Sequence, residues 1–210
     1  MAFRIPRMLR HAVLAVALTV PAIGTLPAFA ATPAESFISD NIQHGLGILN
    51  DPQLSASQRG DQFEHLLLNL TDMKRIAVFT LGQYAQTASQ ADQDAFAAAF
   101  QNYSVAVYHS YLGRYAGQTL KVTGSAERAP EDYIVKTVMI DPNDHSGQRP
   151  LEVDFRVRTD TGKPELIDIS VAGIWLALEE RDQFGAFMAQ NHGDIKALIG
   201  HLQQVAAGYN

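Results

Sequence analysis

The chain of 210 residues contains no cysteine. This absence excludes disulfides, thiolate metal sites and a cysteine nucleophile. It also excludes the lipidated cysteine that anchors bacterial lipoproteins. The fold must therefore be stabilised by packing and hydrogen bonds, without covalent cross-links.

Long hydrophobic runs are also absent. The most apolar stretch, Ala12–Val20, is shorter than the roughly 20 residues that a transmembrane helix requires. It follows a segment with three arginines and precedes Ala28-Phe29-Ala30, which offers small residues at the positions of a cleavage site. This pattern predicts a signal peptide over residues 1–30, cleaved near Ala30. We therefore expect an exported, periplasmic protein with one domain over residues 31–210.

Basic residues are scarce once this leader is set aside. The chain has 16 lysines and arginines against 22 aspartates and glutamates, and three of the arginines fall within residues 1–30. The remaining 13 basic and 22 acidic residues give the mature chain a formal charge of −9. An acidic protein gains little from phosphate backbones or anionic lipid surfaces, so nucleic acid is not an expected partner.

Patterns typical of catalysis or metal binding are missing too. No G-x-S-x-G motif occurs, and the histidines are scattered without metal-ligand spacing. The loop Asp141–Gly147 has the wrong spacing for a calcium loop. The neighbouring carboxylates Glu179 and Glu180 are most simply explained as a solvated helix face. The sequence therefore predicts no metal, no cofactor and no enzyme activity.

An aromatic helix occupies the middle of the chain. Ser89 followed by Asp92 resembles a capping box, and Gly117 supplies a stop. Apolar residues between them recur every three or four positions, as they do on one face of a helix. The stripe comprises Phe96, Phe100, Tyr103, Val107 and Tyr111. Aromatic stripes of this kind mostly pack into a core, so the pattern also fits a solid interior.

Helical periodicity continues on both sides of this segment, and alternation of apolar and polar residues appears after Gly117. The expected helices span residues 37–49, 55–70, 72–81, 178–190 and 194–206, and Asp194 is suited to cap the last one. The expected strands lie around residues 120–122, 133–140, 151–157 and 166–174. This order is typical of an α+β domain in which N-terminal and C-terminal helices pack on one face of a curved, four-stranded antiparallel sheet.

Two apolar surfaces, one helical and one on the sheet, face each other in this arrangement. Ligand pockets are mostly apolar, and a space between the two surfaces has to be filled because protein interiors pack densely. We therefore hypothesise an interior that binds the apolar part of a lipid. The helical wall comprises Ile76, Phe79, Tyr84, Phe100, Tyr103, Val107 and Tyr111, and the strand wall comprises Val135, Val153, Phe155, Val157, Ile169, Val171 and Trp175.

Several short motifs occur in a fixed order between residues 55 and 202. They are Leu81-Gly82-Gln83-Tyr84, Ser89–Phe100, Leu112–Gly117, Val153-Asp154-Phe155, Asp168–Gly173 and Arg181-Asp182-Gln183-Phe184. Together they resemble the MlaC (toluene-tolerance) family of periplasmic phospholipid-binding proteins. The match covers nearly the whole mature chain, which makes it more specific than any single motif.

The resemblance implies a soluble carrier with an NTF2-like α+β cone that holds the acyl tails of a phospholipid between helices and sheet. It also implies a shuttle between an outer-membrane lipoprotein complex and an inner-membrane ABC transporter with MCE-domain subunits. The chain departs from the family pattern at Pro164 and Ile167, where Trp and Tyr are usual, and at the turn Ala172–Trp175. These departures leave open the hopanoid-associated (HpnM-like) branch, whose cargo is a polycyclic lipid.

Two other functions are compatible with an apolar pocket. An NTF2-like enzyme would use an inward carboxylate as a base, and Asp168 or Asp154 is the candidate. Both alternate out of phase with the apolar positions of their strands, so we expect them to face solvent. A chaperone for lipoproteins would instead bind a peptide or an acylated protein.

Overall fold

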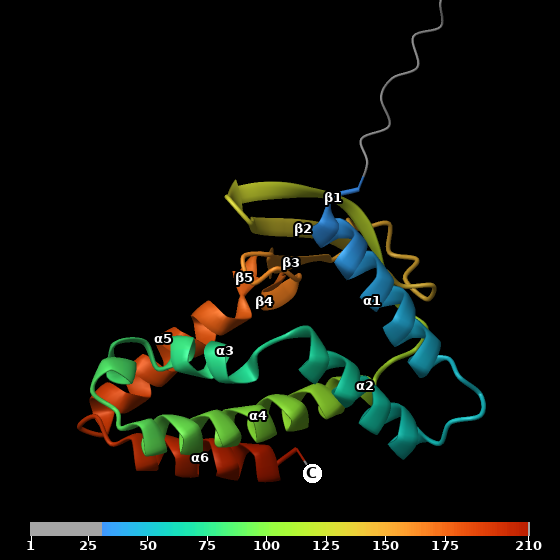
Figure 1. Cartoon of the computed structure of the whole chain (residues 1–210). Helices are drawn as coiled ribbons and strands as arrows, with labels where there is room; N and C mark the ends of the chain where they lie inside the picture. Colours follow the sequence, from blue (N-terminus) through green and yellow to red (C-terminus); the bar gives the residue numbers. More distant parts are fainter. Residues whose placement is uncertain (1–30, 210) are drawn as a thin grey trace, which may run out of the picture. The chain divides into compact units, whose positions relative to one another are not determined.

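The computed structural model of the chain describes residues 31–209 (Figure 1). The predicted signal peptide and its cleavage position at Ala30 lie outside these residues. The elements in chain order are α1 (Pro33–Leu49), α2 (Ala56–Leu70), α3 (Met73–Thr80), the 3₁₀ turn η1 (Gly82–Gln86), α4 (Gln90–Leu112), β1 (Thr119–Ala129), β2 (Asp132–Ile140), β3 (Glu152–Arg158), β4 (Glu165–Val171), β5 (Ile174–Trp175), α5 (Leu176–Gln190) and α6 (Ile195–Ala207).

Polar side chains at the N-termini explain where most of the helices begin. Thr32 and Ser55 form capping boxes at α1 and α2. Ser89 and Asp194 accept hydrogen bonds from backbone N–H groups in the first turns of α4 and α6, as the sequence predicted. The helix boundaries follow the predicted ones closely, except that α1 begins earlier, at Pro33, and α4 ends at Leu112, before the predicted stop at Gly117.

The sheet is antiparallel, and its strands lie in the order in which they occur in the chain. The four long strands form the predicted meander, but the prediction missed a fifth strand, β5. The reason is a tight turn at Ala172 and Gly173, whose φ angles of 52° and 85° are both positive. Turns of this kind match the twist of paired strands, so Ile174 and Trp175 fold back onto the end of β4.

Buried apolar side chains form two separate clusters within residues 31–209. The first joins α3, α4, α5 and α6 and comprises Ala77, Leu81, Phe96, Ala99, Phe100, Phe184, Met188, Leu198 and Leu202. The second joins α1 to the sheet and comprises Ala34, Ile38, Val135, Val157 and Leu166. The molecule therefore has a helical core and a helix-on-sheet core.

The helices reach the sheet at two places. Helix α1 packs on β1, β2 and β3, and α5 packs on β4 and β5. Helix α4 packs mainly on α6 and α3 instead, and Figure 1 shows α4 lying alongside α6. The inner face of α4 is thus turned toward the sheet without being pressed against it.

Candidate functional site

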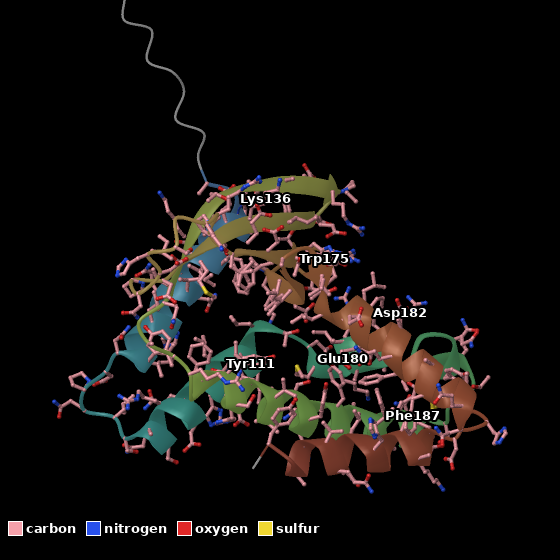
Figure 2. All side chains as sticks on the ribbon, turned by 180° about the vertical axis from the view of Figure 1, so that it is seen from behind. Tyr111, Lys136, Trp175, Glu180, Asp182 and Phe187 are labelled. Carbon is pink, nitrogen blue, oxygen red and sulfur yellow. The ribbon has the colours of Figure 1, made fainter. Side chains whose placement is uncertain are left out.

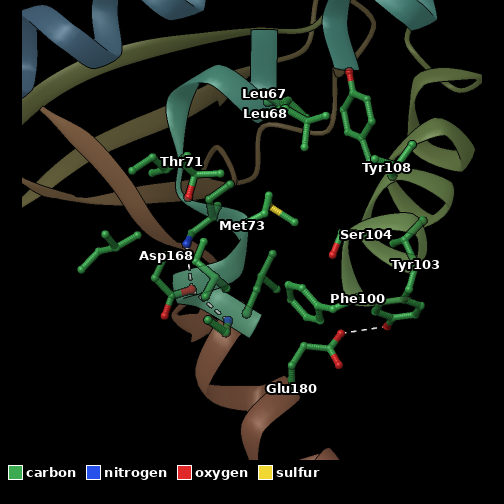
Figure 3. Close-up of a pocket in the computed structure, with 18 of the residues that line it drawn as sticks. Leu67, Leu68, Thr71, Met73, Phe100, Tyr103, Ser104, Tyr108, Asp168 and Glu180 are labelled. Atoms are coloured by element: carbon green, nitrogen blue, oxygen red, sulfur yellow. Dashed lines mark hydrogen bonds between the residues drawn. The ribbon is translucent and has the colours of Figure 1, made fainter. Parts of the chain in front are cut away.

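An apolar cavity of about 320 Å³ lies between α2, α3, α4, the start of α5 and β4 (Figure 3). Its volume is at the lower end of the range of roughly 300–1,000 Å³ that is usual for ligand pockets. Apolar residues make up most of its lining: Leu67, Leu68, Met73, Ile76, Phe100, Val105, Val107, Leu166, Ile167, Ile169, Leu176 and Ala177. The polar residues in the lining are Glu64, Thr71, Tyr103, Ser104, Tyr108, Tyr111, Asp168 and Glu180.

The predicted wall residues divide into two groups. Those that line this cavity are Ile76, Phe100, Tyr103, Val107, Tyr111 and Ile169. Those that do not line it are Phe79, Tyr84, Val135, Val153, Phe155, Val157, Val171 and Trp175. All of the wall residues predicted on α4 line the cavity. Of those predicted on the strands, only Ile169 does.

Two helical wall residues, Phe79 and Tyr84, do not line the cavity. Both lie beside α5 or the residues that follow it. Phe79 is 41% exposed, and the Arg181 guanidinium lies 5.2 Å from the centre of its ring. Tyr84 packs beside Gly193, just after α5. Helical spacing alone could not separate these positions from Ile76, because α3 also has neighbours on its other sides.

Three of the strand residues that miss the cavity, Val135, Phe155 and Val157, belong to or pack against the cluster between α1 and the sheet. Val135 and Val157 have no exposed surface and pack against Ala34 and Ile38. Alternation had correctly identified these side chains as inward-facing, since Phe155 also packs against this cluster. The element opposite them is a helix that fills the space, so this part of the predicted wall is solid.

Several cavity residues were missed by the sequence analysis. Leu67 and Leu68 line the cavity while the adjacent Leu66 is buried in another direction, so three consecutive leucines serve more than one surface. The sequence did contain a signal for these residues, because three consecutive leucines are wider than one helical stripe and must face more than one surface. Glu180 also lines the cavity, so its assignment to a solvated helix face is wrong.

A hydrogen bond between α4 and α5 is the main polar feature of the lining. The Tyr103 hydroxyl donates to Glu180 Oε1 at 2.8 Å (Figure 3). The second oxygen, Glu180 Oε2, is buried and has no hydrogen-bond partner within residues 31–209. Burial raises the pKa of Glu180, and the bond from Tyr103 only partly opposes this effect. The cavity environment thus makes ionisation of Glu180 less favourable than it is in water.

Two further buried polar atoms lack a partner. They are the Thr71 hydroxyl and the Tyr108 hydroxyl. Together with Glu180 Oε2 they are all of the unpartnered buried side-chain oxygens and nitrogens found in the described part of the chain, and all three residues line the cavity. Each such atom costs about 1–3 kcal/mol. Unpartnered polar atoms are rare in native proteins, and their concentration here makes the cavity the candidate functional site.

Asp168 is buried and hydrogen-bonded to the backbone, so the prediction that it faces solvent is wrong. It is 9% exposed, and its Oδ1 accepts hydrogen bonds from the backbone N–H groups of Ile169 and Ala177 at 2.8 and 2.9 Å. Burial raises its pKa, and the two backbone bonds oppose that shift. The carboxyl group holds the first turn of α5 against β4, where the helix dipole also favours negative charge. Asp154 does not line the cavity.

The cavity opens to solvent between α4 and the start of α5. Tyr111 and Leu176 both line it and are 64% and 44% exposed. Figure 2 shows Tyr111 on α4 and Trp175 at the start of α5, on the two sides of this region. These exposed lining residues define the mouth, which we call the Tyr111–Leu176 mouth.

The lining contains acidic residues and no basic ones. Glu64, Asp168 and Glu180 contribute carboxyl groups, whereas the lining includes no lysine, arginine or histidine. No cluster of three or more histidine, aspartate or glutamate side chains within residues 31–209 could hold a metal ion. None of the helices in this part of the chain is both long and apolar enough to cross a bilayer.

Comparison with known proteins identifies the family. The family profile described as "MlaC protein" matches residues 39–204. A solved structure with the same fold is the phospholipid-binding protein from Ralstonia solanacearum, determined in complex with a phospholipid. Its TM-score is 0.72 at 20% sequence identity, over 86% of this chain and 99% of that chain. The likeness supports the α+β fold predicted from the sequence, and the profile match over most of the chain shows that this protein belongs to the MlaC family.

Proposed function

We propose that this protein is a periplasmic carrier that binds a phospholipid by placing acyl chain in the cavity beneath the Tyr111–Leu176 mouth. The observation that carries the proposal is the cavity itself, which is apolar, open to solvent at one end and built into an MlaC fold. The phospholipid bound by the Ralstonia protein of the same fold supports the choice of cargo.

The energetics favour a carrier that works with partners. Removing an acyl chain from water yields about 0.8 kcal/mol per methylene, so water does not extract the cargo. A bilayer offers an equally apolar environment, and transfer between bilayer and cavity is therefore close to neutral. Loading and unloading then need docking partners that lower the barrier. We propose the outer-membrane lipoprotein complex and the inner-membrane ABC transporter with MCE subunits for these roles, on the basis of family membership.

The periplasmic location rests on two arguments. Family membership is one, and the predicted signal peptide over residues 1–30 is the other. A cleaved leader ending near Ala30 would leave the matched region, residues 39–204, intact.

The volume of the cavity bears on how the lipid is held. An apolar cavity of roughly 150 Å³ accommodates the six carbons of benzene, so about 320 Å³ holds on the order of 13 carbons. This is part of one acyl chain. We propose that the rest of a two-chain phospholipid lies outside the mouth, against the exposed side chains of Leu176, Ile174 and Leu178, which are 44%, 57% and 46% exposed.

An enzyme with the same fold is the second candidate, and one observation favours it. Glu180 is an acid in an apolar cavity, held by Tyr103, and groups of this kind serve as general acids or bases. Asp168 holds the start of α5, and Asp154 lies outside the cavity, so an enzyme would have to use Glu180. Such an enzyme would return a chemically altered lipid, whereas a carrier returns it unchanged.

The test is to export the protein into a bacterial periplasm, purify it without detergent and identify bound molecules by native mass spectrometry and lipid extraction. We expect intact phospholipid. A hopanoid would assign the protein to the polycyclic-lipid branch, an altered lipid would favour the enzyme, and a bound protein would favour the chaperone. A protein that is empty and takes up no phospholipid from vesicles would contradict the proposal.

A matched pair of substitutions on α4 tests the position of the cargo. Val107 lines the cavity, so Val107→Trp should fill it and reduce lipid occupancy at least tenfold. Asn102 is exposed on the same helix, so Asn102→Trp should leave occupancy unchanged. Circular dichroism would verify that both variants fold. Equal lipid occupancy in the two variants would contradict the assignment of this cavity to the cargo.

A further inference from the structure

The Tyr103–Glu180 hydrogen bond closes one side of the cavity. Tyr103 is on α4 and Glu180 on α5, and their 2.8 Å hydrogen bond joins the two helices. Figure 3 shows the bond along one edge of the cavity, with Leu67 and Leu68 at the opposite edge. The pair is therefore a boundary of the cavity that is made by two side chains.

Both helices lead from the mouth to this pair. On α4, Tyr111 at the mouth and Tyr103 are two turns apart, a rise of about 12 Å at 1.5 Å per residue. On α5, Leu176 at the mouth and Glu180 are one turn apart, a rise of about 6 Å. A chain that enters at the Tyr111–Leu176 mouth and runs between the helices thus meets the pair as an end wall.

The space behind the pair is filled. The ring of Phe184 packs edge-on against Tyr103, with 6.5 Å between ring centres. The same ring contacts Phe100 and Phe96 at 6.2 and 5.9 Å. Phe96 and Phe184 are 0% and 5% exposed, so this aromatic cluster fills the space behind the pair, and Phe100 is its member that faces the cavity.

We propose that Tyr103 and Glu180 form the end wall that sets the length of acyl chain the cavity accepts. This inference rests on the proposed function, because it takes the cavity to hold an acyl chain. It adds a specificity role for two particular side chains, which neither the family profile nor the phospholipid-bound relative assigns.

The chemistry of the pair suits a wall against a hydrocarbon. Glu180 Oε1 is satisfied by Tyr103, while Oε2 has no partner. The Tyr103 hydroxyl covers Oε1, and Oε2 is buried away from solvent, so the pair presents little hydrated surface to a terminal methyl group.

The size of the wall predicts the size of the effect. Changing Glu180 to alanine removes four heavy atoms. On the scale of roughly 150 Å³ for the six carbons of benzene, the roughly 50 Å³ of the lost methylene and carboxyl groups adds room for about two chain carbons. Changing Glu180 to glutamine keeps the shape and retains an oxygen that can accept the Tyr103 hydrogen bond. The two variants therefore separate the volume of the wall from its ionisation.

The experiment measures binding of single-chain phospholipids with one headgroup and increasing acyl length to the delipidated mature protein. For the wild type we expect affinity to rise roughly fourfold per added methylene until the chain reaches the wall, and then to level off. Glu180→Ala should move this levelling-off point to chains about two carbons longer, whereas Glu180→Gln should leave it in place.

Controls on the same helices keep the outcomes separate. Glu179→Ala changes the exposed neighbour of Glu180, and Asn102→Ala changes the exposed neighbour of Tyr103. Neither should move the levelling-off point. If no variant and no wild-type protein binds any length, the proposed function fails. If the wild type binds but Glu180→Ala and Tyr103→Ala both keep its length profile, the carrier stands and the end wall is refuted.

Discussion

Two apolar regions of this molecule differ in how completely they are filled. Where α1 lies on the sheet, Ile38, Val135 and Val157 are at most 3% exposed and belong to one cluster. Where α2, α3, α4 and α5 meet β4, residues of similar chemistry surround a cavity of about 320 Å³. Periodicity thus shows which side chains turn inward, but it does not show whether the space they face is occupied.

The difference arises from the partners of the helices. Helix α1 has the sheet as its main apolar partner and packs directly on it. Helix α4 instead packs on α6 and α3, and its aromatic residues Phe96 and Phe100 are locked against Phe184 of α5. This packing holds α4 in place without the sheet, so a cavity can persist beside β4 without collapsing.

The largest expected effect compares one residue type in the two regions. Ile38 is 3% exposed in the filled region, so Ile38→Ala should lower the free energy of unfolding by about 2–5 kcal/mol. Ile76 is half-buried and lines the cavity, so Ile76→Ala should cost less than about 2 kcal/mol because fewer contacts are lost. Urea denaturation of the delipidated proteins measures both. Equal losses would show that the two regions are packed alike.

The second prediction compares Asp132, a carboxyl group in an ion pair, with Glu180, a carboxyl group without one. Asp132 is 4% exposed, and Arg156 donates to both of its oxygens at 3.0 and 2.8 Å. In Glu180, one carboxyl oxygen accepts a hydrogen bond from the Tyr103 hydroxyl and the other has no hydrogen-bond partner. Asp132→Asn should therefore lower the free energy of unfolding by about 2 kcal/mol. The loss is less than for a fully buried pair, because the side chains of Arg156 and of the second partner, Arg128, are 25% and 54% exposed. Glu180→Gln should change the free energy of unfolding by less than about 1 kcal/mol near neutral pH. A larger loss for Glu180→Gln would reverse the comparison.

The same two acids predict opposite pH dependences. Hydrogen bonds from Arg156 lower the pKa of Asp132, so its contribution is complete above about pH 4 and is lost as the pH falls through the lowered value. Burial raises the pKa of Glu180, so its contribution is complete below about pH 4 and is lost as the pH rises through the raised value.

Unfolding midpoints measured across a pH series test both directions. The stability of Glu180→Gln relative to wild type should improve as the pH rises above about 4, because the variant has no carboxyl group to ionise. The deficit of Asp132→Asn should shrink as the pH falls below that value. A pH-independent difference between either variant and the wild type would contradict the corresponding assignment.

The sequence predicted the elements of the fold better than it predicted the site. Capping residues and periodicity located the helices and the four long strands because these depend on local chemistry. The α4 residues of the cavity, Tyr103 and Val107 among them, followed from the same periodicity. Val135 and Val157 were placed in the wall because alternation could not reveal that α1 covers them. Glu180 was missed because its position depends on where β5 ends and α5 begins.

The smallest expected effect concerns Phe79, which the sequence placed in the cavity wall. In the structure it is 41% exposed and stacks with Arg181 outside the cavity. Phe79→Ala should therefore lower the free energy of unfolding by about 1 kcal/mol, through lost packing and the cation–π contact. Lipid occupancy should stay at the wild-type level, whereas Phe100→Ala, which alters a lining residue, should change it. If Phe79→Ala reduces lipid occupancy as much as Phe100→Ala does, the cargo extends over the outer face of α3, and the division between a filled region and one hollow region no longer holds.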